Sequence, residues 1–318
     1  MTEAKPLCQE SLALFRHLDD RLGEAHTLEN LAWTCTGNDR DQAVHYFQES
    51  LRIFRTMDCI EESRRLLSTL AQMAREESNI SLSRHFLAEA LELADMGYSA
   101  TTDIYLMNNL AESASLAGDY EQAERLLSRS LASVSNSGSK QDLAWICGGL
   151  AENGWHRGDY QTGLLYGERS LRLFRELDDD MGLTIVLHHL GLLWLALDNL
   201  ARASVCLLES LERCQSMAHT LIVARCLAAL GALASLRQDF TQTVRLLSVV
   251  APHFAQHHLE LTPADLAFYR RLQEEAHAQL GDTAFDQAWA AGCRLSLEHA
   301  SVLALVDASS KYSRADPR

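Results

Sequence analysis

A repeat of forty residues runs through most of this chain and limits what it can fold into. Leucine recurs at this spacing, and a polar turn follows each leucine eight residues later. The recurring leucines are Leu70, Leu110, Leu150, Leu190 and Leu230, and the turns begin at Ser78, Gly118, Gly158, Asp198 and Gln238. A fixed period between about twenty and fifty residues indicates a stacked array of similar units. Such an array forms an extended surface rather than an active-site cleft, so the repeat predicts a binding protein.

The stretch 101–138 shows how one unit is built. Apolar residues within 104–114 recur at spacings of three and four, which gives one apolar helical face. Gly118 and Asp119 then interrupt the helix, since glycine adopts the left-handed conformation that ends a helix and aspartate caps the next one. A second amphipathic stretch covers 123–134, so each unit is predicted to be a helix–turn–helix hairpin in an all-α fold. Its small residue followed by leucine also recurs, as Ser11-Leu12, Ser50-Leu51, Ala90-Leu91, Ser130-Leu131, Ser170-Leu171 and Ser210-Leu211.

Composition favours helices and argues against several classes of protein. Hydrophobic residues make up 47% of the 318 residues, while 4 prolines and 16 glycines are few for an all-β fold. The formal net charge of −15 argues against direct nucleic-acid binding, because an acidic surface repels phosphate. No apolar run reaches the ~18 residues needed to span a bilayer, and the N-terminus is acidic where a signal peptide is basic. We therefore expect a cytoplasmic protein without membrane contact.

The ends of the array are irregular and define the expected domains. Residues 1–250 are predicted to hold a half-repeat and six hairpins, 251–308 a helical C-terminal cap, and 309–318 a disordered tail. The first recognisable element, Gln9–Leu18, aligns with the second helix of a hairpin. Because its partner helix is missing, we expect the chain to be cut from a longer array.

The spacing within each unit resembles the tetratricopeptide repeat. Leu110 and Ala111 match the Leu-Gly of that motif, Tyr120 matches its aromatic residue after the turn, and Ala123 matches its first packing alanine. The period of forty exceeds the usual value of about 34. The resemblance implies a right-handed superhelical solenoid with a concave groove.

The closing segment adds a second resemblance. Residues Leu280–Ala300, LGDTAFDQAWAAGCRLSLEHA, are similar to the end of the tetratricopeptide arm in bacterial signal-transduction ATPases with numerous domains (STAND), including LuxR-type, AfsR-like and MalT-like transcription regulators. In that family the arm binds an inducer or a partner protein and thereby controls an ATPase. The chain has no G-x-x-x-x-G-K-[ST] phosphate loop and no recognisable DNA-reading motif after Val306, so ATP hydrolysis and DNA binding do not transfer to it.

The tetratricopeptide resemblance also nominates groove residues, because the first helix of each hairpin lines the groove in that family. In the middle of the array these positions combine aromatic rings with amide, carboxylate and imidazole groups, which suit capture of a peptide or a small-molecule inducer. The candidate binding residues are Tyr105, Asn108, Glu112, Trp145, Glu152, Trp155 and His188. The alternative is that Trp145 and Trp155 pack one hairpin against the next.

The first two units nominate further groove positions, namely His26, Glu29, Trp33, Arg65, Ser68, Gln72 and Arg75. The arginines could bind an acidic peptide, but Glu61 and Glu62, with Glu76 and Glu77, surround them. Local neutralisation is therefore the favoured interpretation.

The sequence gives little support for catalysis, a metal or a cofactor. Glu112 and Glu152 lie one repeat apart and could serve acid–base chemistry, yet carboxylates so placed more often bind a basic partner. His253 and His257 share a helix face, but no cysteine or carboxylate completes a site at ligand spacing. We expect no cofactor and no enzyme activity. Two hypotheses remain: a sensor arm that acts with an ATPase in cis or in trans, and a free-standing adaptor that assembles other proteins.

Overall fold

The computed structural model describes residues 4–36, 39–77, 79–94, 100–137, 139–217, 220–256 and 261–312. Every regular element within these ranges is an α-helix, which confirms the predicted all-α class. The chain divides into two compact units, unit 1 (Met1–Ser113) and unit 2 (Ala114–Arg318).

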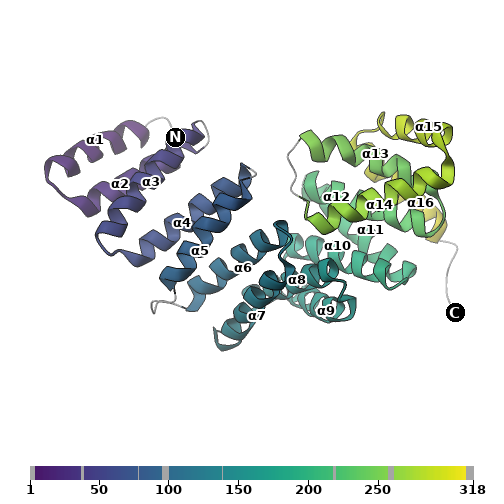
Figure 1. The fold of residues 1–318 in the computed structure, drawn as a ribbon, viewed down its shortest axis with the longest axis horizontal. Coiled ribbons are helices and arrows are strands. Elements are labelled where there is room, and N and C mark those ends of the chain that lie inside the picture. Colours follow the sequence, from purple (N-terminus) through teal and green to yellow (C-terminus); the bar gives the residue numbers. More distant parts are fainter. Residues whose placement is uncertain are drawn as a thin grey trace. The chain divides into compact units, whose positions relative to one another are not determined.

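The described part of unit 1 is a series of helices, of which the first five pack each on the next (Figure 1). They are α1 (Ala4–His17), α2 (Arg21–Cys35), α3 (Arg40–Thr56), α4 (Ile60–Glu76), α5 (Ile80–Ala94) and α6 (Ala100–Leu116), which ends just beyond the unit boundary. The pairs α2–α3 and α4–α5 form hairpins, as the repeat predicts. The leading helix of a hairpin is called its first helix, and the surface formed by α2 and α4 is the first-helix face of unit 1.

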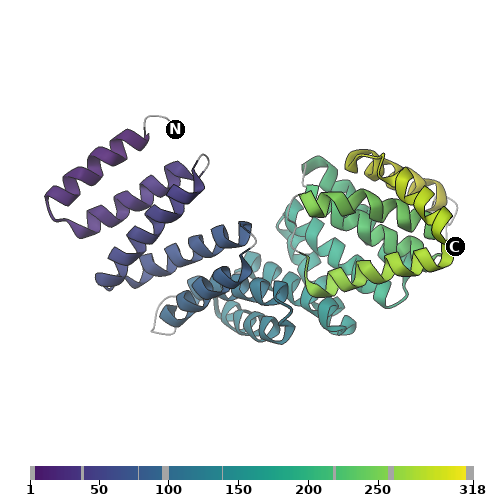
Figure 2. The same cartoon turned by 45° about the horizontal axis from the view of Figure 1, so that its top comes forward.

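Unit 2 contains hairpins of the same kind and closes with three further helices (Figure 2). Its array contains α7 (Tyr120–Ser137), α8 (Lys140–Arg157), α9 (Tyr160–Glu176), α10 (Asp180–Ala196), α11 (Leu200–Met217), α12 (Thr220–Leu236) and α13 (Phe240–Gln256). The first helices α8, α10 and α12 contact one another in order and form the first-helix face of unit 2. Helices α14 (Pro263–Leu280), α15 (Asp282–Gly292) and α16 (Leu297–Tyr312) pack against α12 and α13.

Four of the turns inside hairpins, those described from α6–α7 to α12–α13, repeat one backbone conformation. Gly118 and Gly158 have φ values of 81° and 78°, and the equivalent Asp198 and Gln238 have φ values of 57° and 64°. The next residue caps the following helix, as where Asp119 Oδ1 accepts from the backbone N–H of Gln122 at 3.1 Å. Equivalent caps are formed by Asn79, Asp159, Asn199 and Asp239. The predicted Gly–Asp turn is thereby confirmed.

In three units the serine of the recurring Ser-Leu pair is a buried hydrogen-bond donor, whereas the buried Ser130 hydroxyl has no partner among the described residues. The Ser170 hydroxyl donates to the backbone carbonyl of Ala144 at 2.8 Å, which ties α9 to α8. Ser50 and Ser210 donate in the same way to carbonyls of α2 and α10, at 2.8 and 2.7 Å. The small side chain that the sequence shows is therefore needed for a hydrogen bond as well as for close packing.

Where the sequence motif FR-x-LDD occurs, a phenylalanine packs over a glycine and joins one hairpin to the next. The Phe174 ring lies where a Cβ atom would stand at Gly182, and Phe15 takes the same position over Gly23. A side chain at either glycine would have to displace the phenylalanine ring. Phe174 is fully buried in unit 2, whereas Phe15 in unit 1 is half-buried.

The closing helices follow the sequence closely, with one difference. Helix α14 lies within the predicted cap, and Gly281 ends it with a φ of 72°. The last helix continues to Tyr312 and so enters the segment 309–318, for which a disordered tail was predicted. No glycine or proline stands between Val306 and Tyr312 to end it. Residues 313–318 lie outside the described ranges.

Candidate functional site

Polar side chains gather where the three first helices of unit 2 stack. Glu152 on α8, His189 on α10 and Arg225 on α12 follow one another at intervals of 37 and 36 residues, close to the repeat period. The Glu152 carboxylate lies 3.6 Å from His189 Nε2 and 4.0 Å from the Arg225 guanidinium. Burial would raise the pKa of Glu152, but the basic side chains of His189, His156 and Arg225 hold it below its usual value. Glu152 is therefore an ionised carboxylate.

A second carboxylate, that of Asp265, enters this cluster from α14. Trp155 Nε1 donates to Asp265 Oδ1 at 3.4 Å, and His156 Nε2 lies 3.5 Å from the same oxygen. The Thr262 hydroxyl donates to Oδ2 at 2.9 Å, and the Arg225 guanidinium lies 3.9 Å from it. Burial would raise the pKa of Asp265, but the hydrogen bond and charge of His156, followed by Arg225, keep it well below its usual value.

Aromatic contacts hold the first turn of α14 in place. The Trp155 ring meets the Phe268 ring edge-on at a centroid distance of 5.1 Å. Tyr120 stacks on His156 at 5.0 Å, and its hydroxyl oxygen accepts the backbone N–H of Ala264 at 2.9 Å. The beginning of α14 is thus bound by side chains of α7, α8 and α12.

Sequence reasoning nominated Glu152 and Trp155 but missed five members of the cluster: His156, His189, Arg225, Thr262 and Asp265. A local signal marks the start of α14. Thr262 is an N-cap residue that accepts the backbone N–H of Asp265 at 3.2 Å, and Pro263 occupies the first helical position. This Thr-Pro-x-Asp pattern predicts where the helix begins, but it does not predict what the helix packs against.

His188 borders the cluster and is buried between α10 and α12. Its Nδ1 lies 3.9 Å from Cys226 Sγ. Burial, reinforced by His189 and Arg225, lowers the pKa of His188 well below its usual value. His188 is consequently neutral at physiological pH.

The remaining candidates lie apart from the cluster. Trp145 stands ten residues before Trp155 on α8 and meets Phe174 edge-on at 5.0 Å, which fits the packing alternative for this tryptophan. Asn108 and Glu112 lie on the part of α6 that belongs to unit 1. Asn108 Oδ1 is buried and has no hydrogen-bond partner among the described residues, whereas Glu112 pairs with Arg75. Tyr105 is also on α6, but its side chain lies outside the described part of the structure.

The first-helix face of unit 1 contains a cavity of about 420 Å³. It is lined by His26, Glu61, Glu62, Arg65, Ser68, Thr69 and Gln72. Several of these residues occupy positions that the repeat frame assigned to the groove. Arg65 donates to Glu29 one hairpin earlier at 2.8 Å, and Arg75 pairs with Glu112 one hairpin later. Neighbouring repeats therefore supply the neutralising carboxylates of these two arginines.

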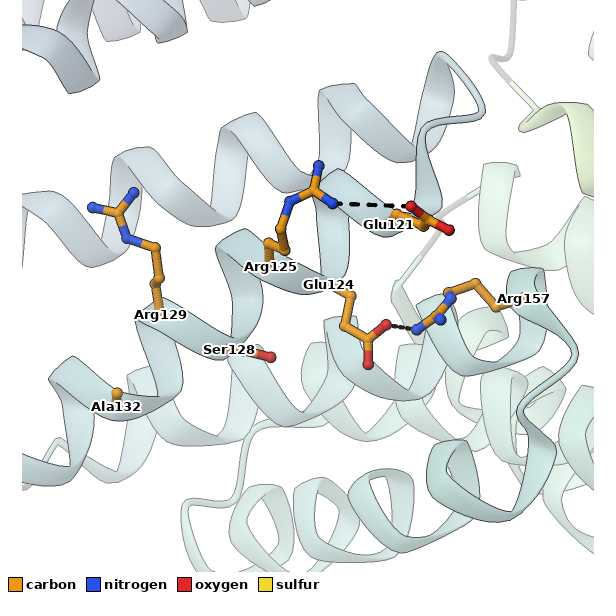
Figure 3. A pocket seen from close by; sticks show the side chains of 7 residues that line it. All are labelled: Glu121, Glu124, Arg125, Ser128, Arg129, Ala132 and Arg157. Carbon is orange, nitrogen blue, oxygen red and sulfur yellow. Dashed lines mark ion pairs between the residues drawn. The ribbon is translucent and has the colours of Figure 1, made fainter.

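A wider hollow of about 720 Å³ lies on α7 and the end of α8 in unit 2 (Figure 3). Two ion pairs lie within it: Arg157 pairs with Glu124, and Arg125 lies 4.0 Å from Glu121 (Figure 3). Exposed ion pairs of this kind have little excess affinity for a ligand. The hollow is best described as a solvated helix surface.

The chemistry of the buried cluster is charge recognition rather than proton transfer. Asp265 and Glu152 are both ionised and both face cations, so they do not form a proton-sharing acid–base pair. Across the described ranges no group of three or more His, Cys, Asp or Glu side chains is arranged to hold a metal ion. His257 and His258 lie outside those ranges.

None of the helices that the structure describes combines the length and the apolar character needed to cross a membrane.

Comparison with known proteins agrees with the hairpin architecture. The tetratricopeptide-repeat family model matches residues 1–56 and 100–176. No curated protein matches the sequence. Among solved structures, BtubC (BKLC) from P. vanneervenii is 17% identical with a TM-score of 0.57, and the match covers 69% of this chain and 92% of that one.

Two further structures match nearly the whole chain. The STAND protein with a tetratricopeptide repeat sensor from Pyrococcus horikoshii is 13% identical, with a TM-score of 0.54 over 99% of this chain and 50% of that chain. This chain thus spans about half the length of the STAND protein. A Rap protein complexed with competence and sporulation factor is 12% identical, with a TM-score of 0.54 over 97% of this chain and 99% of that chain. At these identities the likeness concerns the fold alone. The chain is therefore an all-helical protein with a tetratricopeptide-repeat-like fold, and two of its stretches match the tetratricopeptide-repeat model.

Proposed function

We propose that this chain is a non-catalytic binding module and acts as the sensor arm of a bacterial signal-transduction ATPase of the STAND class. The observation that carries the proposal is the cavity on the first-helix face of unit 1, which Arg65, Ser68 and Gln72 line with polar groups. These side chains line the cavity and not the apolar core, so a protein, a peptide or a small-molecule inducer that entered the cavity would meet polar groups.

The regulatory part of the proposal rests on two kinds of likeness. The closing segment Leu280–Ala300 resembles the end of the arm in LuxR-type, AfsR-like and MalT-like regulators. One structural neighbour is described as a STAND protein with a tetratricopeptide repeat sensor. A stack of hairpins suits this role, because small rotations between neighbours add up along the array and change its contacts with an ATPase in cis or in trans.

A second candidate is a free-standing sensor or adaptor that works without an ATPase. The Rap protein supports it, since that protein was crystallised with a bound factor and this chain covers 99% of its length. Both candidates bind a partner through the first-helix face of unit 1, and they differ in what that binding controls.

The test is to purify the chain with the ATPase encoded beside it, or as part of the same polypeptide, and to measure ATP hydrolysis with and without the chain. The sensor-arm proposal expects hydrolysis to change by several-fold. A photo-crosslinking residue at Gln72 should label the partner, while one at the exposed Arg52 on α3 should not. Unchanged hydrolysis with a specific Gln72 crosslink would support the adaptor. No crosslink at either position would reject binding through this face.

A further inference from the structure

The two hydroxyl groups that line the cavity of unit 1 are hydrogen-bond acceptors toward its interior. Ser68 Oγ donates to the backbone carbonyl of Arg64 at 3.2 Å, and Thr69 Oγ1 donates to the backbone carbonyl of Arg65 at 3.1 Å. A hydroxyl has one hydrogen to donate and two lone pairs that accept. Because both hydrogens are used inside α4, each oxygen offers lone pairs to a ligand that enters the cavity.

The arginine that lines the cavity is already paired. The Arg65 guanidinium donates to both carboxylate oxygens of Glu29 on α2, and the bond to Oε2 is 2.8 Å long. A bidentate pair of this kind fixes the guanidinium and offsets its charge. Arg65 therefore forms a wall of the cavity and attracts an acidic ligand only weakly.

The carboxylates at the start of α4 give the cavity an excess of negative charge. Glu61 accepts a hydrogen bond from Arg64 at 3.2 Å and is still 45% exposed. Glu62 lines the same cavity and forms no ion pair within the described part of the chain. The three carboxylates of Glu29, Glu61 and Glu62 thus outnumber the two guanidinium groups of Arg64 and Arg65.

These acceptors follow one side of α4 instead of converging on one point. Glu61 and Glu62 lie in its first turn, and Ser68 and Thr69 come seven residues later, which separates the two pairs by about 10 Å along the helix axis. A single compact cation cannot reach both pairs. A short extended peptide can, because three residues span about 10 Å and its backbone N–H groups are donors.

We infer that this cavity binds a basic segment of a partner protein, whose cationic side chain pairs with Glu61 and Glu62 and whose backbone N–H groups donate to Ser68 and Thr69. The volume of about 420 Å³ lies within the range of about 300–1,000 Å³ that is usual for ligand sites. The inference rests on the proposed function and names the chemistry of the partner at the same site. A basic segment is the opposite of the acidic peptide that the arginines of this face would attract if they were unpaired.

The test uses three acetylated and amidated pentapeptides that have alanine at four positions and differ at the second, which is arginine, citrulline or glutamate. Citrulline keeps the shape of arginine and lacks its charge. Each peptide is titrated into the full chain labelled with ¹⁵N, and the backbone amide signals of α4 are followed by NMR. The arginine peptide should bind about fivefold more tightly than the citrulline peptide, and the glutamate peptide should bind most weakly.

Variants of α4 locate the binding. Glu62→Gln removes a charge at constant shape and should weaken the arginine peptide about fivefold, to the level of the citrulline peptide. Glu61→Gln is a second charge variant and should act in the same direction. The matched control is Glu92→Gln, which changes an exposed carboxylate on α5 of the same hairpin and should leave binding unchanged. Thr69→Val, which replaces the hydroxyl by a methyl group, should weaken the arginine peptide without altering its preference over the citrulline peptide.

Two results would overturn the inference. One is equal binding of the arginine and citrulline peptides to the full chain, and the other is tighter binding of the glutamate peptide. An equal loss of affinity in Glu62→Gln and in the control would place the binding elsewhere on the acidic surface and would also count against the inference. Melting temperatures show that each variant is folded before its affinity is compared.

These outcomes are separate from the fate of the proposed function, because the peptides require neither an ATPase nor a natural partner. A specific crosslink from Gln72 without a preference for the arginine peptide would overturn the basic partner and keep the binding module. A clear preference for the arginine peptide with unchanged ATP hydrolysis would support the chemistry of the cavity and reject the ATPase sensor arm.

Discussion

Arginines on the two first-helix faces stand in different surroundings. In unit 1, Arg65 reaches Glu29 of the preceding hairpin while its own side chain stays 51% exposed. In unit 2, Arg225 is 20% exposed and lies between Glu152 and Asp265, and Asp265 is only 8% exposed. The repeat frame is the same on both faces. The difference comes from α14, which covers the second face, so equivalent repeat positions acquire different electrostatics from a segment outside the repeat.

The largest expected effect concerns two arginines, Arg225, which α14 covers, and Arg75, which is more exposed to solvent. Arg225→Met should lower the free energy of unfolding by about 2–4 kcal/mol, because Glu152 and Asp265 would lose their arginine partner in a buried site. Arg75→Met, which removes the more open pair with Glu112, should cost less than about 1 kcal/mol. Urea unfolding monitored by circular dichroism measures both losses. Equal losses would show that α14 does not change the environment of this face.

Acid should destabilise unit 2 more than unit 1. Burial lowers the pKa values of His188 and His189 below 6.5, so the unfolded chain binds protons that the folded chain excludes. Stability should therefore fall as the pH drops below 6.5, by at most about 1.4 kcal/mol per pH unit for each histidine. The carboxyl of Asp265 has a lowered pKa, so its contribution is lost only at pH values below 3.8 and does not affect this window.

Hydrogen exchange at pH 7.5 and 5.5, corrected for the intrinsic rate, locates the acid effect. Amides of α8, α10 and α12 should lose protection at the lower pH, while those of α2 and α4 should change less. His188→Gln should reduce the difference. A uniform loss across both units would contradict the assignment to these histidines.

The smallest effect compares the two phenylalanine–glycine contacts. Gly182→Ala should cost about 1 kcal/mol net, because displacing the buried Phe174 costs more than the roughly 1 kcal/mol of helix propensity that alanine adds. Gly23→Ala should be near neutral, since the half-buried Phe15 can move. Melting temperatures of the two variants are sufficient for the test. A cost at Gly23 as large as at Gly182 would mean that Phe15 is held as firmly as Phe174.

Much of the fold could be predicted because its signals are local and repeated. The Gly118–Asp119 turn places one helix end and one helix start, and the same pattern recurs at each period. The hydrogen bond made by the recurring serine was harder to predict. Ala90 occupies the equivalent position in one unit, so the pattern indicates a small side chain without requiring a hydroxyl.

The site could be predicted only in part. Glu152 and Trp155 followed from the repeat frame, which fixes the side of a first helix that faces outward. Asp265 could not be predicted as their neighbour, because it lies 110 residues from Trp155 and beyond the last repeat. No periodic pattern connects the two segments, so only the folded structure brings them together.

Helix α14 contacts hairpins that are not neighbours, and this also affects how unit 2 should unfold. In a simple stack each hairpin touches only its neighbours, so an array can lose structure from one end, hairpin by hairpin. Helix α14 contacts Trp155 in one hairpin and packs on α12 and α13 two hairpins later. Loss of any hairpin between them would break both sets of contacts. Unit 2 is therefore expected to melt in a single cooperative step, whereas unit 1 can fray gradually from α1.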